Sequence, residues 1–308
     1  MLKIDFNTIY LLLQALLCCT LTVCHAEPSK PKPQVGLPLL YYREPHLINF
    51  GDYLSLKIVE RIVGEKVVVY PRVFGIPPNP GEKKLLAIGS IFSFARTNDV
   101  IWGSGINGKI SNKKDYLFSQ LDIRAVRGPL TRHYLMYELG IPCPEIYGDP
   151  ALLIPYLFPE FKKKENPSLD YLIIPHYADM KYFPKTKYQN VIYPTEPWDR
   201  IINKIVDSKF VISSSLHGII VAEAFGIPAK LLRVSETEKI FKFHDYYYGT
   251  GRYDFSYATS VEEALMKGGE KPINCDLKKL YESFPFEFWG EKKPKKINFK
   301  ATKSNANK

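Results

Sequence analysis

The sequence predicts an α/β protein built on parallel β-sheets. Short apolar runs that suit buried strands alternate along the chain with segments of helical periodicity. Several of these runs are continuously apolar, which is typical of strands covered on both faces. In residues 210–228, such a run leads through three serines directly into a helical segment. Alternation of this kind favours parallel sheets, because each pair of parallel strands needs a crossover connection.

In the first part of the chain, strand-like runs surround two helical segments. Strands are expected at residues 37–42, 67–70 and 85–88, in a run entering a glycine turn at 101–105, and at 123–126. The helix expected at 53–63 has one apolar side, and Asp52 is placed to cap its N-terminus. The helix expected at 129–139 begins with Pro129 and ends at Gly140. Residues 151–157 close this first unit.

A charged break at residues 161–166 separates a second series of elements. Strands are expected at 172–175, 191–193, 210–212 and 229–234, and helices at 198–208, 219–225, 261–267 and 277–282. We therefore expect two Rossmann-like α/β units that face each other across a cleft. The N-terminal unit covers residues 37–160 and the C-terminal unit covers residues 168–290, with the boundary near 158–168.

Both ends of the chain differ from its middle. Residues 9–23 form an apolar run of 15 residues, shorter than the roughly 20 residues of a spanning helix. Small residues, Cys24 and Ala26, follow it, so residues 1–26 are either a cleaved signal peptide or an uncleaved signal anchor that associates with a membrane. Either one implies the secretory pathway or the cell envelope. Residues 27–36 are a Pro/Lys linker, and residues 291–308 are a basic, disordered tail.

The composition is that of a soluble globular protein, with 308 residues of which 45% are hydrophobic and 24% charged. Seven lysines and one acid give the tail +6 of the net charge of +10. No nucleic-acid-binding motif accompanies them, so no nucleic-acid partner is expected. Dinucleotide fingerprints, a P-loop and metal-ligand spacings are also missing from the sequence, so we expect neither a metal nor a cofactor. Outside the leader, Cys143 and Cys275 form one bridge or remain two free thiols.

The strand–turn–helix segment at 210–228 is the best candidate for a site. Its turn lies at the carboxyl end of a strand, where open α/β sheets bind ligands. The following helix offers free N–H groups to an anion, and His217 at the turn can transfer protons near neutral pH. The alternative is a capped helix with a packed histidine.

Motifs in this segment and elsewhere resemble the polysaccharide pyruvyl transferase family. They cover roughly residues 37–254 and run in the family's order. They are NFGD at 49–52, WGSG at 102–105, RGPLTR at 127–132, GDPALL at 148–153 and SSSLHGIIVAEAFGIP at 213–228. The resemblance implies a GT-B-like arrangement of the two units. It also implies a transferase whose donor is phosphoenolpyruvate and whose acceptor is a glycan or lipid-linked oligosaccharide. The product is a pyruvate ketal on two sugar hydroxyls.

The resemblance assigns roles to particular residues. His217 matches the family's general acid, and Ser215 and Gly218, on either side of Leu216 and His217 in its L-H-G turn, are expected to bind substrate. Many members have an arginine where this chain has Ser215, so a donor anion needs a cation from elsewhere. Arg127 supplies one, because its planar guanidinium suits carboxylate and phosphate, although a surface ion pair is the alternative.

Further residues are weaker candidates for substrate binding. These are Asn49, Asp52, Asp149, Lys242 and His244. For Asp52 the alternative is a helix cap, for Asp149 a turn residue, and for Lys242 and His244 an interface helix. The tyrosines at 246–248 are interpreted as packing residues, and His46, His133 and His176 as surface or packing histidines.

Two other functions stay open on this sequence. A GT-B-type glycosyltransferase would bind a nucleotide sugar in place of phosphoenolpyruvate. A glycan-binding relative without activity would keep the fold, and Ser215 in place of arginine is consistent with it. The leader also raises a question of supply, because phosphoenolpyruvate is a cytosolic metabolite.

Overall fold

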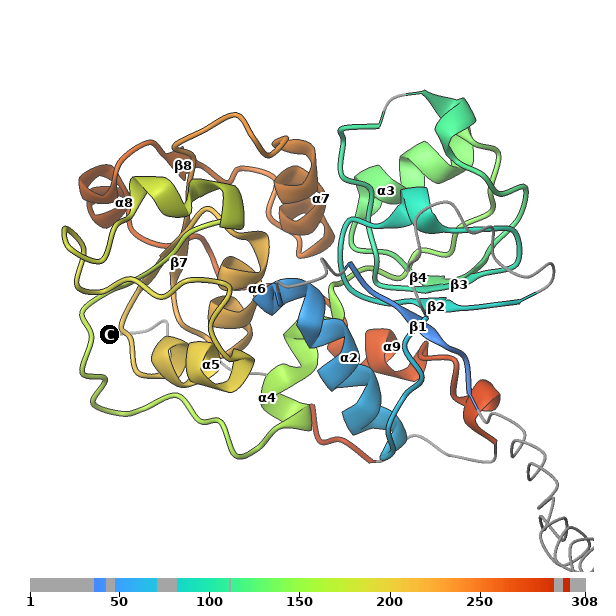
Figure 1. The fold of residues 1–308 in the computed structure, drawn as a ribbon, viewed down its shortest axis with the longest axis horizontal. Coiled ribbons are helices and arrows are strands. Elements are labelled where there is room, and N and C mark those ends of the chain that lie inside the picture. The colour runs from blue at the N-terminus through green and yellow to red at the C-terminus, as the bar shows by residue number, and fades with distance from the viewer. Residues whose placement is uncertain (1–35, 43–47, 71–81, 111, 291–295, 300–308) are drawn as a thin grey trace, which may run out of the picture. The chain divides into compact units, whose positions relative to one another are not determined.

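The computed structural model describes residues 36–42, 48–70, 82–110, 112–290 and 296–299. It contains two four-stranded sheets in which every neighbouring pair is parallel and the strand order follows the chain (Figure 1). The first sheet holds β1 (Leu39–Leu40), β2 (Leu85–Leu86), β3 (Val100–Trp102) and β4 (Asp122–Ala125). The second holds β5 (Leu172–Ile174), β6 (Val211–Ser213), β7 (Ala229–Leu232) and β8 (Tyr257–Ala258). The predicted α/β class with parallel sheets is confirmed, whereas the facing GT-B-like arrangement stays a prediction.

Helices connect and cover these strands. The α-helices are α2 (Phe50–Val63), α3 (Pro129–His133), α4 (Ile154–Leu157), α5 (Trp198–Val206), α6 (Leu216–Ala224), α7 (Phe241–Gly249), α8 (Val261–Lys267) and α9 (Leu277–Glu282). The helix predicted at 129–139 changes after α3 into a π-helical turn over Tyr134–Glu138. Short 3₁₀ turns include Pro150–Leu153, which runs into α4, and Tyr177–Tyr182, which follows β5.

Two segments that were predicted as strands do not form strands in the structure. Residues 67–70 and 191–193 make only isolated parallel bridges, Val69 to Leu39 and Val191 to Ile173. The apolar character of these runs is real, because Val69 packs against the core and Val191 is buried in it. Packing therefore accounts for their sequence without a ladder of hydrogen bonds. Conversely, β8 was not predicted, because its two residues are too few to form a pattern.

Both helices that bear on the site begin three residues before their predicted starts. In α2 the cap is Asn49, whose Oδ1 accepts from the Gly51 N–H at 3.1 Å, so the expected cap Asp52 lies inside the first turn. In α6 the residue before the helix is Ser215, with extended backbone, and His217 is the second helical residue instead of a turn residue. Helix geometry therefore fixes the directions of the Asp52 and His217 side chains.

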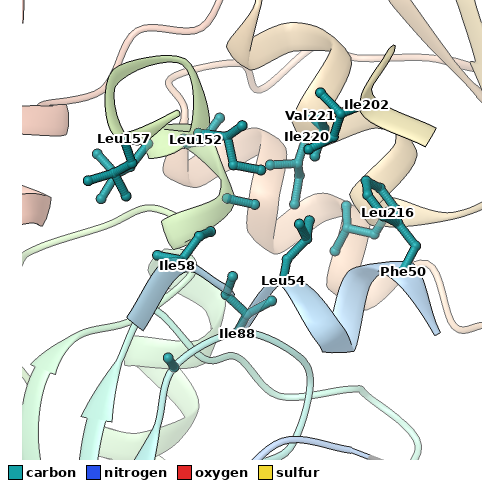
Figure 2. Packing of buried hydrophobic residues seen from close by; sticks show 14 of the residues in the cluster. Phe50, Leu54, Ile58, Ile88, Leu152, Leu157, Ile202, Leu216, Ile220 and Val221 are labelled. Atoms are coloured by element: carbon teal, nitrogen blue, oxygen red, sulfur yellow. The ribbon is translucent and has the colours of Figure 1, made fainter. Parts of the chain in front are cut away.

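The apolar core explains how the sheets hold these helices. Alternate strand residues face opposite sides: Leu39 and Leu85 belong to one buried cluster, and Leu40 and Leu86 to another. The larger cluster also takes residues from the second sheet and from the helices that cover it. Figure 2 shows side chains of α2, α5, α6 and the 150–157 segment meeting in this cluster. Helices α2 and α6 are in contact there, so their first turns are held near each other.

The predicted leader at 1–26 and almost all of the linker at 27–36 lie outside the described residues, as does most of the tail at 291–308. In the part of the chain that the structure describes, no helix is both long enough and apolar enough to cross a membrane. The described residues from Gly36 onward group as one compact unit. The division into units at 37–160 and 168–290 stays a prediction.

Candidate active site

A cavity of about 570 Å³ lies among the loops and helix starts that follow the strands. Both sheets contribute to its walls. Its polar lining includes Asn49, Asp52, Lys109, Arg127, Asp149, His176, Ser215, His217, Glu238 and Lys242. Of the candidate site residues predicted from sequence, all but Gly218 and His244 line this cavity.

His217 meets a carboxylate in the cavity wall. Its Nε2 lies 3.5 Å from Oδ2 of Asp149, which is within ion-pair distance. This nitrogen is buried and has no hydrogen-bond partner among the described residues. The other oxygen of Asp149 accepts from the Ala151 N–H at 2.9 Å and so caps the turn before α4. The sequence allowed Asp149 to be either a turn residue or a cavity carboxylate, and in the structure it is both.

The opposite edge of the imidazole lies against the start of α2. A Cβ added to Gly51 would lie 2.0 Å from Nδ1 of His217 and 2.5 Å from its Cγ. Such distances are far below van der Waals contact, so only glycine allows the helix to approach the ring this closely. Asn49 caps the same turn of α2 through Gly51. The ring of His217 thus lies between Gly51 on one side and Asp149 on the other.

The N-terminus of α6 opens on the cavity through Ser215. The hydroxyl of Ser215 makes no capping hydrogen bond to the helix, and its backbone N–H donates to Oγ of Ser213 at 3.0 Å. Gly218, two residues after the helix start, does not line the cavity. A Cβ there would lie 2.4 Å from Oγ of Ser213 and 3.2 Å from the Cβ of Ile174, so Gly218 allows α6 to pack closely on β5 and β6.

Arg127 lines the cavity but is only 1% exposed, so it is not the surface ion pair considered from sequence. Its Nε donates to Oδ2 of Asp245 at 3.0 Å, and its Nη2 donates to the Ile106 carbonyl at 2.6 Å. Its Nη1 donates to Oγ of Ser90, another residue of the cavity wall, at 2.7 Å. The guanidinium is thus held rigidly, with a buried carboxylate offsetting its charge.

Two lysines, a glutamate and a histidine form a second charged group in the wall. Oε1 of Glu238 lies 2.5 Å from Nζ of Lys109, and Oε2 pairs with Nζ of Lys242. Burial alone would raise the pKa of Glu238, but Lys242 and Lys109 outweigh it and lower the pKa to about 2. Burial also lowers the pKa of Lys242, against the attraction of Glu238.

His176 completes this group. Its Nδ1 accepts from the Ala178 N–H at 3.2 Å, so the proton of the neutral ring is on Nε2, which lies 3.8 Å from Oε1 of Glu238. Burial, with help from the Lys242 charge, lowers the pKa of His176 to about 4, and the ring is neutral near pH 7. His176, Lys109 and Glu238 were not predicted from the sequence as site residues. One signal was available, because His176 comes directly after the predicted strand at 172–175.

The remaining candidates pack elsewhere. His244 contacts the rings of Tyr248 and Phe255 and lies 3.2 Å from the Tyr248 hydroxyl, away from the cavity lining. Tyr246 and Tyr247 are fully buried, as the packing interpretation requires. Cys143 and Cys275 are free, and burial raises the pKa of each thiol to about 12. Within the described residues no three acidic, histidine or cysteine side chains are grouped to hold a metal ion.

Comparison with known proteins adds an independent result. Residues 49–235 match the family model described as polysaccharide pyruvyl transferase. The chain is 30% identical over 210 residues to an uncharacterized protein, L143, of Acanthamoeba polyphaga mimivirus, covering 65% of this chain and 70% of that protein. It is also 30% identical over 218 residues to the succinoglycan biosynthesis protein ExoV of Rhizobium meliloti, covering 67% of this chain and 63% of ExoV. A solved structure of a functionally uncharacterized Klebsiella pneumoniae protein shows a weak likeness, with a TM-score of 0.43, 12% identity, and coverage of 84% of this chain and all of that one.

Proposed function

Since this chain belongs to the polysaccharide pyruvyl transferase family, we propose that it transfers the pyruvyl group of phosphoenolpyruvate to two hydroxyls of a glycan sugar. The observation that carries the proposal is the His217–Asp149 pair, which lines the same cavity as three basic side chains, Lys109, Arg127 and Lys242. The reaction needs a proton donor beside a bound anion, and this cavity combines the two.

The chemistry sets the order of events. A proton added to the methylene carbon of the donor makes a methyl group and an oxocarbenium-like centre at the neighbouring carbon. One sugar hydroxyl adds to that carbon and loses its proton. The carbon–oxygen bond to phosphate then breaks, the second hydroxyl adds, and a ketal forms. One hydroxyl proton replaces the proton given to the methylene, and the other leaves on the phosphate.

His217 is the proton donor in this proposal. Its Nε2 faces Asp149, so Asp149 fixes the orientation of the ring as a carboxylate does in other catalytic histidine pairs. The proton is then given from the imidazole, whose position is set by Asp149 on one side and by the close approach of Gly51 on the other. General acid catalysis by a positioned side chain typically contributes about 10²–10⁴-fold in rate.

The two anionic groups of the donor need the cationic part of the wall. The first turn of α6, a helix of nine residues, offers N–H groups beside Ser215. Lys242 supplies a charge from α7, and Arg127, whose charge is partly offset by Asp245, adds a rigidly held guanidinium to the same wall. We propose that these three residues take the place of the arginine that many relatives have before the L-H-G turn.

The acceptor is placed by the rest of the lining. Asn49 and Asp52 provide polar groups at the start of α2, and Tyr177, which is 44% exposed, presents an aromatic ring at the cavity. A flat ring with a polar edge suits a sugar. We propose a glycan or lipid-linked oligosaccharide as the acceptor, with no metal or cofactor. We also propose a location in the secretory pathway or cell envelope, with membrane association if residues 1–26 form an anchor.

We expect phosphoenolpyruvate to bind saturably to the protein, and a nucleotide sugar not to bind. Isothermal titration calorimetry with each compound measures this, and Lys242→Met should weaken the binding of phosphoenolpyruvate while His244→Gln, which changes a residue outside the lining, should not. Tight binding of a nucleotide sugar, with no heat from phosphoenolpyruvate, would instead support the glycosyltransferase.

A further inference from the structure

The carboxylate of Glu238 lies among the basic side chains that an anionic ligand would bind. It pairs with Lys109 through Oε1 and with Lys242 through Oε2, and the protonated Nε2 of His176 lies 3.8 Å from Oε1. The three donors come from different parts of the chain: the loop after β3, the first turn of α7 and the residues after β5. A phosphate or carboxylate group of a ligand needs the same kind of surroundings.

The formal charges of the residues that line the cavity sum to zero if its two histidines are not counted. The charged lining residues are Lys109, Arg127 and Lys242 against Asp52, Asp149 and Glu238. A ligand that carries two anionic groups therefore meets no excess of positive charge in the wall. For such a ligand to bind well, one of the internal carboxylates has to give up its partners.

Glu238 is the acid best placed to do so. The pair of Arg127 with Asp245 is almost completely buried, with side chains 1% and 0% exposed, and Asp245 also accepts from the N–H and hydroxyl of Thr131. Glu238 is 16% exposed and lies in the connection between β7 and α7, outside any helix or strand. Its side chain can turn toward solvent without breaking a regular element.

We propose that Glu238 is an internal anion that occupies the Lys109–Lys242 pair and is displaced by an anionic group of the substrate. The inference rests on the proposed function, which supplies phosphoenolpyruvate as the ligand. A ligand must outcompete a carboxylate of charge −1 that is already in place. The cavity therefore selects phosphate dianions over singly charged carboxylates such as pyruvate, and Glu238 sets the affinity for the donor.

Replacement of Glu238 by glutamine tests this directly, because the side chain keeps its shape and loses its charge. By calorimetry, we expect E238Q to bind phosphoenolpyruvate and inorganic phosphate about tenfold more tightly than the unchanged protein, which corresponds to ~1.4 kcal/mol. Glu236→Gln is the matched control. It removes the same charge two residues away, from a side chain that is 84% exposed and paired with Arg233 outside the cavity lining, and should leave both affinities unchanged.

Unchanged or weaker binding by a folded E238Q protein would overturn the proposal, since Glu238 would then serve to hold the lysines for the ligand. Lys109→Met retains the Glu238–Lys242 pair and should weaken the binding of both anions, which keeps the test valid if E238Q proves unstable.

The two probes separate this inference from the proposed function. If phosphoenolpyruvate does not bind, the proposed function fails, and tighter binding of phosphate by E238Q still supports the internal anion. If neither probe binds to any of these proteins, the internal anion is also excluded.

Discussion

Replacing His217 with alanine is expected to lower the rate of pyruvyl transfer by about 10²–10⁴-fold, the usual contribution of a general acid. The physical reason is that the other histidine of the described lining, His176, also lies beside a carboxylate, that of Glu238, but its ring is held neutral, so it cannot replace His217 as the proton donor. The measurement is phosphate release from phosphoenolpyruvate in the presence of the acceptor glycan. The affinity for phosphoenolpyruvate should change only a few-fold, because His217 donates the proton and other residues bind the anionic groups.

Two further variants show whether the effect is specific. His244→Ala removes a histidine of the neighbouring α7 that contacts Tyr248 and Phe255 outside the cavity lining, and should retain nearly full activity. Gly51→Ala leaves His217 in the chain but puts a methyl group only 2.0 Å from the present position of Nδ1, so the ring must move and activity should fall strongly. If H217A retained the activity of H244A, proton donation by this residue would be excluded.

Arg127→Ala is expected to destabilise the protein by about 3–5 kcal/mol, the typical cost of removing one partner from a buried ion pair. The reason is that the carboxylate of Asp245, which is completely buried, would lose the guanidinium that now lies 3.0 Å away. The hydrogen bonds from Arg127 to Ser90 and to the Ile106 carbonyl would be lost as well. Urea unfolding of the two proteins measures the difference.

Arg124 provides the matched control. It lies on β4, three residues before Arg127, and its ion pairs with Asp122 and Glu287 are partly exposed, with the acidic side chains 36% and 56% accessible. Arg124→Ala should therefore cost no more than about 1 kcal/mol for each pair. Adding Asp245→Asn to Arg127→Ala removes the unpaired charge and should restore part of the stability. If R127A unfolded at the same urea concentration as R124A, the buried pair would not hold this region together.

The sequence revealed the parallel sheets because strands covered on both faces are apolar at every position. Leu39 and Leu40 both lie in the core, on opposite sides of the first sheet, and Ile173 and Ile174 do the same in the second. The same signal misled at 67–70 and 191–193, since a run can be apolar through packing alone. Apolar runs therefore located the layers more reliably than they located individual strands.

The site was predictable where a polar residue stood beside a recognisable helix start or strand end. Asn49, Arg127, Asp149 and His217 all lie at such positions and all line the cavity. The start of α2 was missed because Asn49 and Asp52 are equally good caps by residue type. The start of α6 was missed because several consecutive serines are equally good caps.

Lys109 and Glu238 carried no signal of this kind. Each is a single charged residue in a loop, and only the tertiary structure brings Lys109 to Glu238 across 129 residues of the chain. The same holds for the contact of Gly51 with His217, which depends on how α2 packs against α6. Pairings of this kind are set by the fold, so no local pattern can predict them.

The most direct test of the central claim follows the three carbons of the donor. The protein is incubated with ¹³C-labelled phosphoenolpyruvate and a panel of glycans, and the products are analysed by NMR while phosphate is measured. We predict a labelled methyl group on a ketal carbon of the glycan, one phosphate for each ketal, and loss of both with H217A. Transfer of a sugar from a nucleotide sugar to the same glycans, with no labelled ketal, would contradict the account.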